Sequence, residues 1–170
     1  AITKLDSARI ISYAGALLLL KAGQKIRHAT NAATAQSFES FAQDIYRHET
    51  DALPNTIEPK TRNACLILVG DFLSPLTVIE ERLKSFKNRF SDIYLIQTLD
   101  PAEISLPFNG RMIFDPLGYG QSGQQLDDIE TIRETYKNRI EAHNHALRDF
   151  CLDHGWHYIF HRTDLDYSIA

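Results

Sequence analysis

An unbroken apolar run that ends in Gly-Asp constrains the fold of this chain more than any other feature. Residues 65–69 read Cys-Leu-Ile-Leu-Val, and such a run is typical of a parallel strand buried on both faces. Gly70 and Asp71 follow, and Pro75 then opens a predicted helix with Ser74 as its cap. In an open α/β sheet, ligands bind in the loops beyond the carboxyl ends of the strands. We therefore expect the Asp71 carboxylate at such an edge, where it could hold a cation, accept a phosphoryl group or contact a partner.

The remaining predicted elements alternate between helix and strand. Helices are expected over residues 6–23, 34–47, 75–86 and 127–153, and strands over 24–29, 65–69, 92–99, 111–114 and 156–161. This alternation predicts an α/β fold with a doubly wound, mostly parallel sheet and helices on both faces. Pro101 and Pro107 bracket a predicted loop. The glycines at 118, 120 and 123 indicate a small glycine-rich hairpin insertion near residues 108–126.

Composition favours a single soluble domain over residues 1–170. The net charge of −4 and the pI near 6.0 argue against a nucleic-acid partner, which rewards basic surfaces. Cys65 and Cys151 both fall in predicted buried elements, so we interpret them as core thiols of a cytoplasmic protein. The apolar segment 10–20 is about half the length that a bilayer requires. We expect no membrane span there, and interpret the segment as a helix buried nearly all round.

Two apparent motifs do not predict a site. Residues 118–123 match G-x-G-x-x-G, but a dinucleotide fingerprint needs its glycines directly between a strand and a helix, and residues 124–128 intervene here. The run containing Cys151, His154, His157 and His161 has spacings that a metal could use. It crosses from a predicted helix into a strand, however, where alternate side chains point to opposite faces. Hydrogen-bonded or surface histidines are the simpler interpretation.

Several segments together resemble a known family. Thr3-Lys4-Leu5-Asp6-Ser7-Ala8-Arg9, leading into the apolar helix that Asp6 or Ser7 is expected to cap, and then Gly23-Gln24-Lys25-Ile26, resemble the first helix and second strand of von Willebrand factor A-like domains. Residues 66–73, residues 97–103 and the helix end at 152–156 with Thr163-Asp164 beyond it resemble the bacterial "domain of unknown function 58" branch. The resemblance covers nearly the whole chain.

The resemblance implies a doubly wound fold and a Mg²⁺ site at the carboxyl edge of its sheet. In such domains three loops hold the ion, supplying Asp-x-Ser-x-Ser, a Thr and an Asp, and a partner carboxylate completes the shell, which suits the oxygen preference of Mg²⁺. Asp71 matches the third position and Thr50 the second, with Asp51 beside it. Residues 1–170 contain no Asp-x-Ser-x-Ser. We therefore expect a degenerate or incomplete site, with the first strand and its loop lying upstream of residue 1.

By the same resemblance, the chain is a non-enzymatic adaptor that binds proteins and works with a MoxR-type AAA+ ATPase in the assembly or maturation of other proteins. An alternative class is a receiver-like or hydrolase-type enzyme in which Asp71 is a nucleophile or an acid/base. That alternative requires a Lys or Arg to converge on Asp71. A third hypothesis makes the long helix the contact surface, through exposed Tyr136, Ile140 and Leu147.

Overall fold

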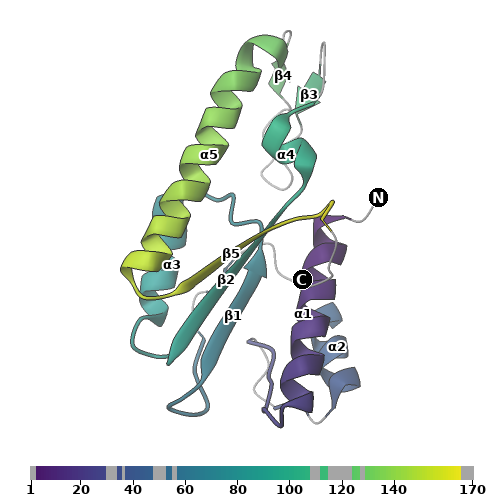
Figure 1. Cartoon of the computed structure of the whole chain (residues 1–170), viewed down its shortest axis with the longest axis vertical. Helices are drawn as coiled ribbons and strands as arrows, with labels where there is room; N and C mark the ends of the chain where they lie inside the picture. The colour runs from purple at the N-terminus through teal and green to yellow at the C-terminus, as the bar shows by residue number, and fades with distance from the viewer. Residues whose placement is uncertain are drawn as a thin grey trace.

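Three parallel strands form the sheet that positions the candidate site. The computed structural model describes residues 3–29, 34–35, 37–47, 53–54, 57–107, 112–114, 124–126 and 129–165. Strands β1 (Cys65–Gly70), β2 (Asp92–Leu99) and β5 (His157–Arg162) lie in the order β1-β2-β5, with both pairings parallel (Figure 1). The strands predicted over 65–69, 92–99 and 156–161 are thus confirmed to within one residue at each end, as is a parallel sheet in an α/β fold. A doubly wound topology remains a prediction.

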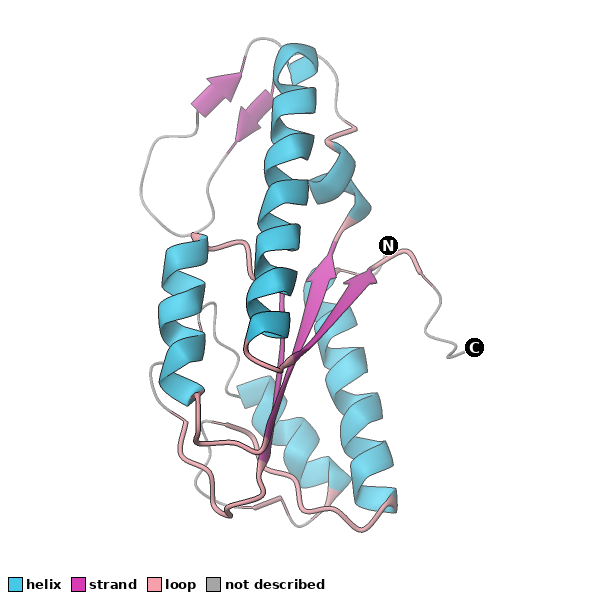
Figure 2. Cartoon of the chain, turned by 60° about the vertical axis from the view of Figure 1, so that its left-hand side comes forward, coloured by secondary structure: helices cyan, strands magenta, loops and turns pink. Residues whose placement is uncertain are grey.

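The core lies between one face of the sheet and helices α3 (Leu76–Phe86) and α5 (Ile129–Asp153) (Figure 2). Helix α3 turns one stripe inward because its apolar residues are spaced three and four apart, and this stripe is buried: Ile79, Leu83 and Phe86. The strands contribute Leu66, Leu68, Ile93 and Leu95, and α5 contributes Leu147, Phe150 and Cys151. Leu147 is therefore a core residue, so its expected exposure on α5 is wrong, whereas Tyr136 and Ile140 are half-buried.

Helix α1 (Lys4–Lys21) lies across the sheet from α3 and α5, with α2 (Phe38–Arg47) beside it (Figure 2). Its cap is Thr3, whose side chain accepts from the Asp6 amide while Asp6 accepts in return, so the expected cap at Asp6 or Ser7 is wrong. Only Ser7 and Ala16 of this helix are buried, and Leu17 and Leu18 are 40% and 58% exposed. The expected all-round burial fails because, within the described part of the chain, α1 packs mainly on β1, β2 and α2, which leave much of its surface open.

Strand β1 is buried on one face only, contrary to expectation. Leu66 and Leu68 face the α3 side, whereas Cys65 is exposed and Ile67 is 44% exposed on the other. The reason is that α1 covers the opposite face incompletely. Cys151 is fully buried as predicted, and both thiols are free.

Three further elements differ from expectation. Residues 24–28 form no strand, and α2 begins at Phe38 instead of residue 34. The predicted loop between Pro101 and Pro107 contains a short helix, α4 (Pro101–Ser105), because Asp100 and Glu103 make a capping box. Strands β3 (Met112–Phe114) and β4 (Gln124–Leu126) pair antiparallel. The glycines at 118, 120 and 123 lie outside the described residues, so the hairpin insertion stays a prediction. None of the described helices is long and apolar enough to cross a membrane.

Candidate functional site

Asp71 lies where the sequence places it, immediately beyond the carboxyl end of β1. Its side chain is 45% exposed, and its Oδ1 accepts a hydrogen bond from the Leu73 amide at 3.3 Å. The segment before it pairs in parallel with β2, from Cys65 opposite Asp92 to Gly70 opposite Gln97. The carboxylate therefore stands at the carboxyl edge of a parallel sheet, within reach of a ligand.

Lys4 binds Asp71 and Glu103 at the same time. Its Nζ donates to Asp71 Oδ2 at 2.9 Å and to Glu103 Oε1 at 2.5 Å. The three residues come from the first turn of α1, the loop after β1 and helix α4, so this charged group joins segments that are far apart in the sequence. The Lys4 and Glu103 side chains are 32% and 27% exposed. We call Lys4, Asp71 and Glu103 the edge triad.

The two carboxylates stabilise the protonated form of Lys4. Partial burial alone would lower the pKa of the Lys4 ammonium, but its hydrogen bonds to Glu103 and Asp71 outweigh this, so the pKa lies above its usual 10.5. Lys4 is accordingly protonated at neutral pH. The edge triad therefore presents two carboxylates with one cation between them.

A buried polar network holds the loop that carries Asp71. Gln97 is fully buried on β2, and its Nε2 donates to the Asp71 carbonyl at 2.8 Å and to Asn144 Oδ1 at 3.1 Å. Tyr158 on β5 donates its hydroxyl to Gln97 Oε1 at 2.5 Å. Burial raises the pKa of the Tyr158 phenol to about 12, so the hydroxyl remains a donor at neutral pH. Side chains of β2, α5 and β5 thus form the network that holds the Asp71 carbonyl in place.

Phe72 fixes the direction in which the chain leaves the site. Its φ of 50° lies in the left-handed region, which costs a non-glycine residue about 1 kcal/mol or more. Its side chain is 7% exposed in the core, and its carbonyl accepts from His143 Nε2 on α5 at 2.7 Å. Core packing and this hydrogen bond offset the backbone strain and aim the Asp71 side chain outward.

The other residues singled out in the sequence either lie outside the described part of the chain or do not take the expected role. Thr50 and Asp51 lie outside the described residues, so their proposed role as metal ligands stays a prediction. Ser74 does not cap α3, because the N-cap position is Pro75 and no side chain bonds there. The described residues contain no group of three or more His, Cys, Asp or Glu side chains placed to hold a metal.

The histidines near the carboxyl end of α5 are held by aromatic neighbours. His154 packs against Phe150 and Trp156, with ring centroids 4.3 and 4.9 Å apart, and its Nδ1 donates to the Phe150 carbonyl. His157 stacks on Tyr94 at 4.2 Å. The interpretation of these residues as hydrogen-bonded or surface histidines fits this arrangement.

Sequence reasoning missed two members of the edge triad. Glu103 carries a recognisable signal, because Asp100-Pro101-Ala102-Glu103 has the spacing of a capping box and could have been read as a helix start beside the sheet edge. Lys4 carries none, since a lysine in the first turn of a helix is ordinary. Only the fold brings residue 4 within 3 Å of residue 71.

Comparison with known proteins identifies the family. A family model described as "Protein of unknown function DUF58" matches residues 20–146. The chain belongs to the DUF58 family. The matched region of this DUF58 protein includes β1, β2 and α4, and with them Asp71 and Glu103, whereas Lys4 precedes it. No curated protein and no solved structure matches the chain.

Proposed function

We propose that this DUF58 chain is a protein-binding module without catalytic activity, and that the edge triad is part of its contact surface. The observation that carries the proposal is the position of Lys4, Asp71 and Glu103, which offer charges of both signs on the exposed carboxyl edge of a rigid parallel sheet. Charged groups on such an edge favour correct partners and repel wrong ones more than they add raw affinity.

The proposed partner is a MoxR-type AAA+ ATPase, with which the domain would act in the assembly or maturation of other proteins. This choice rests on the resemblance of the sequence to DUF58 domains that work with such ATPases. The edge triad supports this choice of partner in one respect. A basic side chain of a partner could replace Lys4, and an acidic one could replace Asp71 or Glu103 in the Lys4 ion pairs.

A Mg²⁺ ion at the same edge is part of the proposal. Asp71 and Glu103 both bind a single cationic group, the Lys4 ammonium, so their oxygens suit a positive charge between them. Asp71 and Thr50 would hold the ion, and the ion would supply an open position for a partner carboxylate. Lys4 would then have to move away from Asp71.

The test compares the Asp71→Ala variant with wild type in binding to the ATPase by calorimetry. We expect a loss of affinity of about tenfold or more, because a charged contact at the interface disappears. The matched control is Asp149→Ala on an exposed position of α5, which should bind as wild type does. Equal affinity of the Asp71→Ala and wild-type proteins would reject the edge triad as a contact surface.

A parallel titration with Mg²⁺ alone separates the metal from the protein contact. Heat of binding to wild type that is absent in Asp71→Ala supports the metal bridge. Identical behaviour of the two proteins removes the ion from the proposal and leaves direct recognition by the edge triad.

One observation favours an enzymatic alternative. Lys4 converges on Asp71 from another element, which is the arrangement that a phosphoryl-accepting aspartate requires. Incubation with acetyl phosphate, followed by mass spectrometry, tests this directly. A phosphorylated Asp71 that is lost in Asp71→Asn would overturn the non-catalytic proposal.

A further inference from the structure

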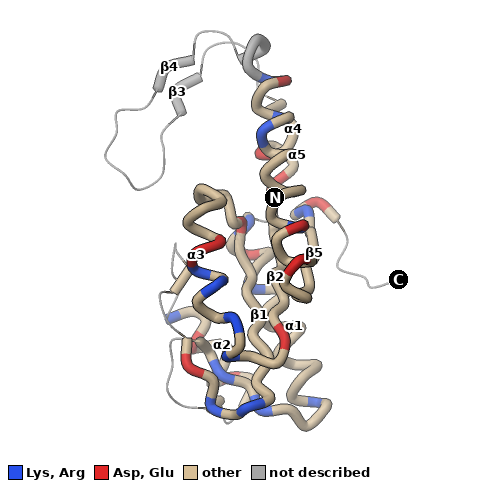
Figure 3. The backbone as a smooth tube through the Cα atoms, turned by 90° about the vertical axis from the view of Figure 1, so that its left-hand side faces the viewer, with Lys and Arg blue, Asp and Glu red and all other residues tan. Residues whose placement is uncertain are grey.

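The loops at the amino-terminal edge of the sheet concentrate positive charge. Residues 24–29, 57–64 and 87–91 carry one acidic side chain, Glu58, although the whole chain has a net charge of −4. Their basic side chains are Lys25, Arg27, Lys60, Arg62, Lys87 and Arg89. We call these three segments the basic loop cluster; Figure 3 shows Lys and Arg gathered at this end of the molecule. Asp71 and Glu103, in contrast, lie at the opposite edge of the sheet, with Lys4 between them.

Hydrogen bonds hold the three loops together. Arg27 Nη2 donates to the Glu58 carbonyl at 2.6 Å, and Arg89 Nη1 pairs with Glu58 Oε1 at 2.5 Å. The Ser91 amide donates to the Ala64 carbonyl at 2.9 Å, which ties the start of β2 to the start of β1. The positive charges are thus carried on a preorganised surface, which reduces the entropy cost of binding a ligand.

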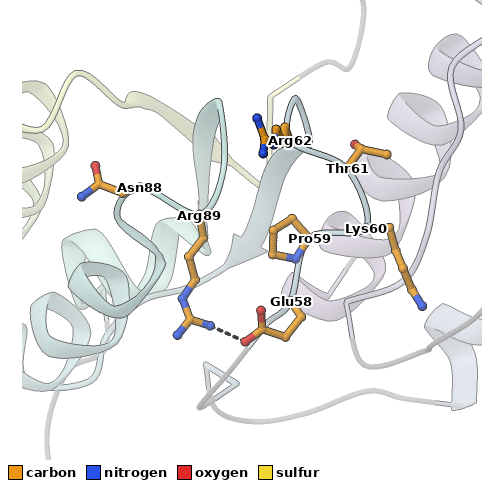
Figure 4. Close-up of a pocket in the computed structure, with 7 residues that line it drawn as sticks. All are labelled: Glu58, Pro59, Lys60, Thr61, Arg62, Asn88 and Arg89. Carbon is orange, nitrogen blue, oxygen red and sulfur yellow. Dashed lines mark hydrogen bonds and ion pairs between the residues drawn. The ribbon is translucent and has the colours of Figure 1, made fainter.

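A cavity of about 400 Å³ opens within this cluster (Figure 4). Lys60, Arg62 and Arg89 line it, together with Thr61, Asn88 and Glu58. Within the described part of the chain, no carboxylate pairs with Lys60 or Arg62. The carboxylate that does enter, Glu58, has a side chain that is 76% exposed, so an incoming carboxylate could replace it on Arg89 at little cost.

We propose that the basic loop cluster binds an acidic segment of a partner protein, with one carboxylate taking the place of Glu58 on Arg89 and others facing Lys60 and Arg62. The Glu58–Arg89 pair favours a carboxylate, since it shows that this group fits the guanidinium in place. A single-stranded nucleic acid is less suited, because Phe90, the one Phe, Tyr or Trp of these loops, packs partly against the core instead of standing free as a stacking platform. A concave pocket also suits a peptide better than a flat lipid surface.

The proposed site is independent of the edge triad. It lies at the other end of β1, which its six residues place roughly 20 Å away. The two proposals can therefore be tested separately. The result for ATPase binding by Asp71→Ala neither supports nor contradicts peptide binding by the basic loop cluster.

The test measures binding of a fluorescein-labelled oligoglutamate peptide to the whole chain by fluorescence anisotropy at low salt. Lys60→Glu combined with Arg62→Glu should weaken binding by about tenfold or more, because two attractions become repulsions. Arg139→Glu combined with Arg148→Glu, both at exposed positions of α5, reverses the same number of charges and should leave the affinity unchanged. Glu58→Gln removes the competing carboxylate and should tighten binding.

Three outcomes would overturn the proposal. One is equal affinity of the wild type and the Lys60→Glu, Arg62→Glu variant, provided that circular dichroism shows both folded. Another is weaker binding by Glu58→Gln. The third is a preference for a single-stranded oligonucleotide or for phosphatidylserine vesicles over oligoglutamate at the same ionic strength, which would assign the cluster to a different class of partner.

Discussion

A single lysine in the first turn of a helix determines how the carboxyl edge of this DUF58 domain is charged. Lys4 joins Asp71 and Glu103, and without it two carboxylates would face each other across a partly buried space. The interaction is worth more than a fully exposed ion pair because Lys4 donates to both acids at once.

Replacing Lys4 with methionine should therefore lower the free energy of unfolding by about 1 kcal/mol at neutral pH, the lower part of the range for charged hydrogen bonds because the triad is partly exposed. The pKa of Lys4 is raised on folding, so its stabilisation is complete below the unfolded pKa of 10.5 and is lost as pH rises through the folded value. Urea denaturation at neutral and alkaline pH measures both effects. Lys137→Met, which removes an exposed i,i+3 pair, serves as control; an equal loss in the two variants would contradict the assigned role.

The buried amide of Gln97 is the second residue that governs the site. Changing it to leucine leaves the Asp71 carbonyl, Asn144 and the Tyr158 hydroxyl each without a hydrogen bond that they now make. We expect a loss of about 1–3 kcal/mol in the free energy of unfolding, measured by chemical denaturation. Coupling to Tyr158→Phe in a double-mutant cycle should be substantial, and strictly additive losses would mean that the network does not act as a unit.

The buried phenol of Tyr158 leads to a prediction about stability at alkaline pH. Its phenol has a pKa of about 12 in the folded protein against 10.0 as the reference value. The unfolded chain therefore releases this proton first, and stability falls as pH rises from about 10 towards 12. Tyrosinate absorbance followed during an alkaline titration measures the late ionisation, which should be missing in Tyr158→Phe. A titration of that variant indistinguishable from wild type would disprove the assignment.

At the scale of elements, α3 and α5 stabilise the sheet and α1 does so less. Leu83 of α3 is fully buried between the strands and α5, whereas Val78 on the same helix is 46% exposed. The Leu83→Ala substitution should cost about 2–5 kcal/mol through lost transfer energy and the cavity left behind. Val78→Ala, the control in the same helix, should change the unfolding free energy by less than about 1 kcal/mol. Thermal and urea denaturation of both variants test the difference.

For the molecule as a whole, the two proposed binding surfaces lie at opposite ends of the strands. The edge triad and the basic loop cluster share no contacts, so the stability effects of Asp71→Ala and Arg62→Glu should add to within about 0.5 kcal/mol. Denaturation of the two single variants and the double variant gives the coupling energy directly. A clear coupling would show that the two ends communicate through β1, and the two proposed surfaces would then be linked.

The sequence predicted the parallel strands and the position of Asp71 because long apolar runs and the residues that end them are local signals. Strand β2 was placed with both of its ends correct, and Asp71 was placed at the carboxyl edge of the sheet. The predictions of secondary structure and burial failed where they depend on which other elements pack against a segment. The strand expected at 24–29 would need a neighbouring strand to pair with. The apolar run of α1 gives no indication of how many elements pack around that helix.

The amino-acid sequence was therefore enough to identify the type of each strongly patterned element and the family to which the chain belongs. The reason is that the spacing of apolar residues and helix capping act within a few residues of one another. Which charged side chains meet depends instead on the packing of the whole chain. Lys4 reaches Asp71 across 67 positions, and Arg27 and Arg89 each meet Glu58 across 31. Contacts between residues so far apart depend on how helices and strands pack together, and the local pattern around a lysine or arginine carries no information about that packing.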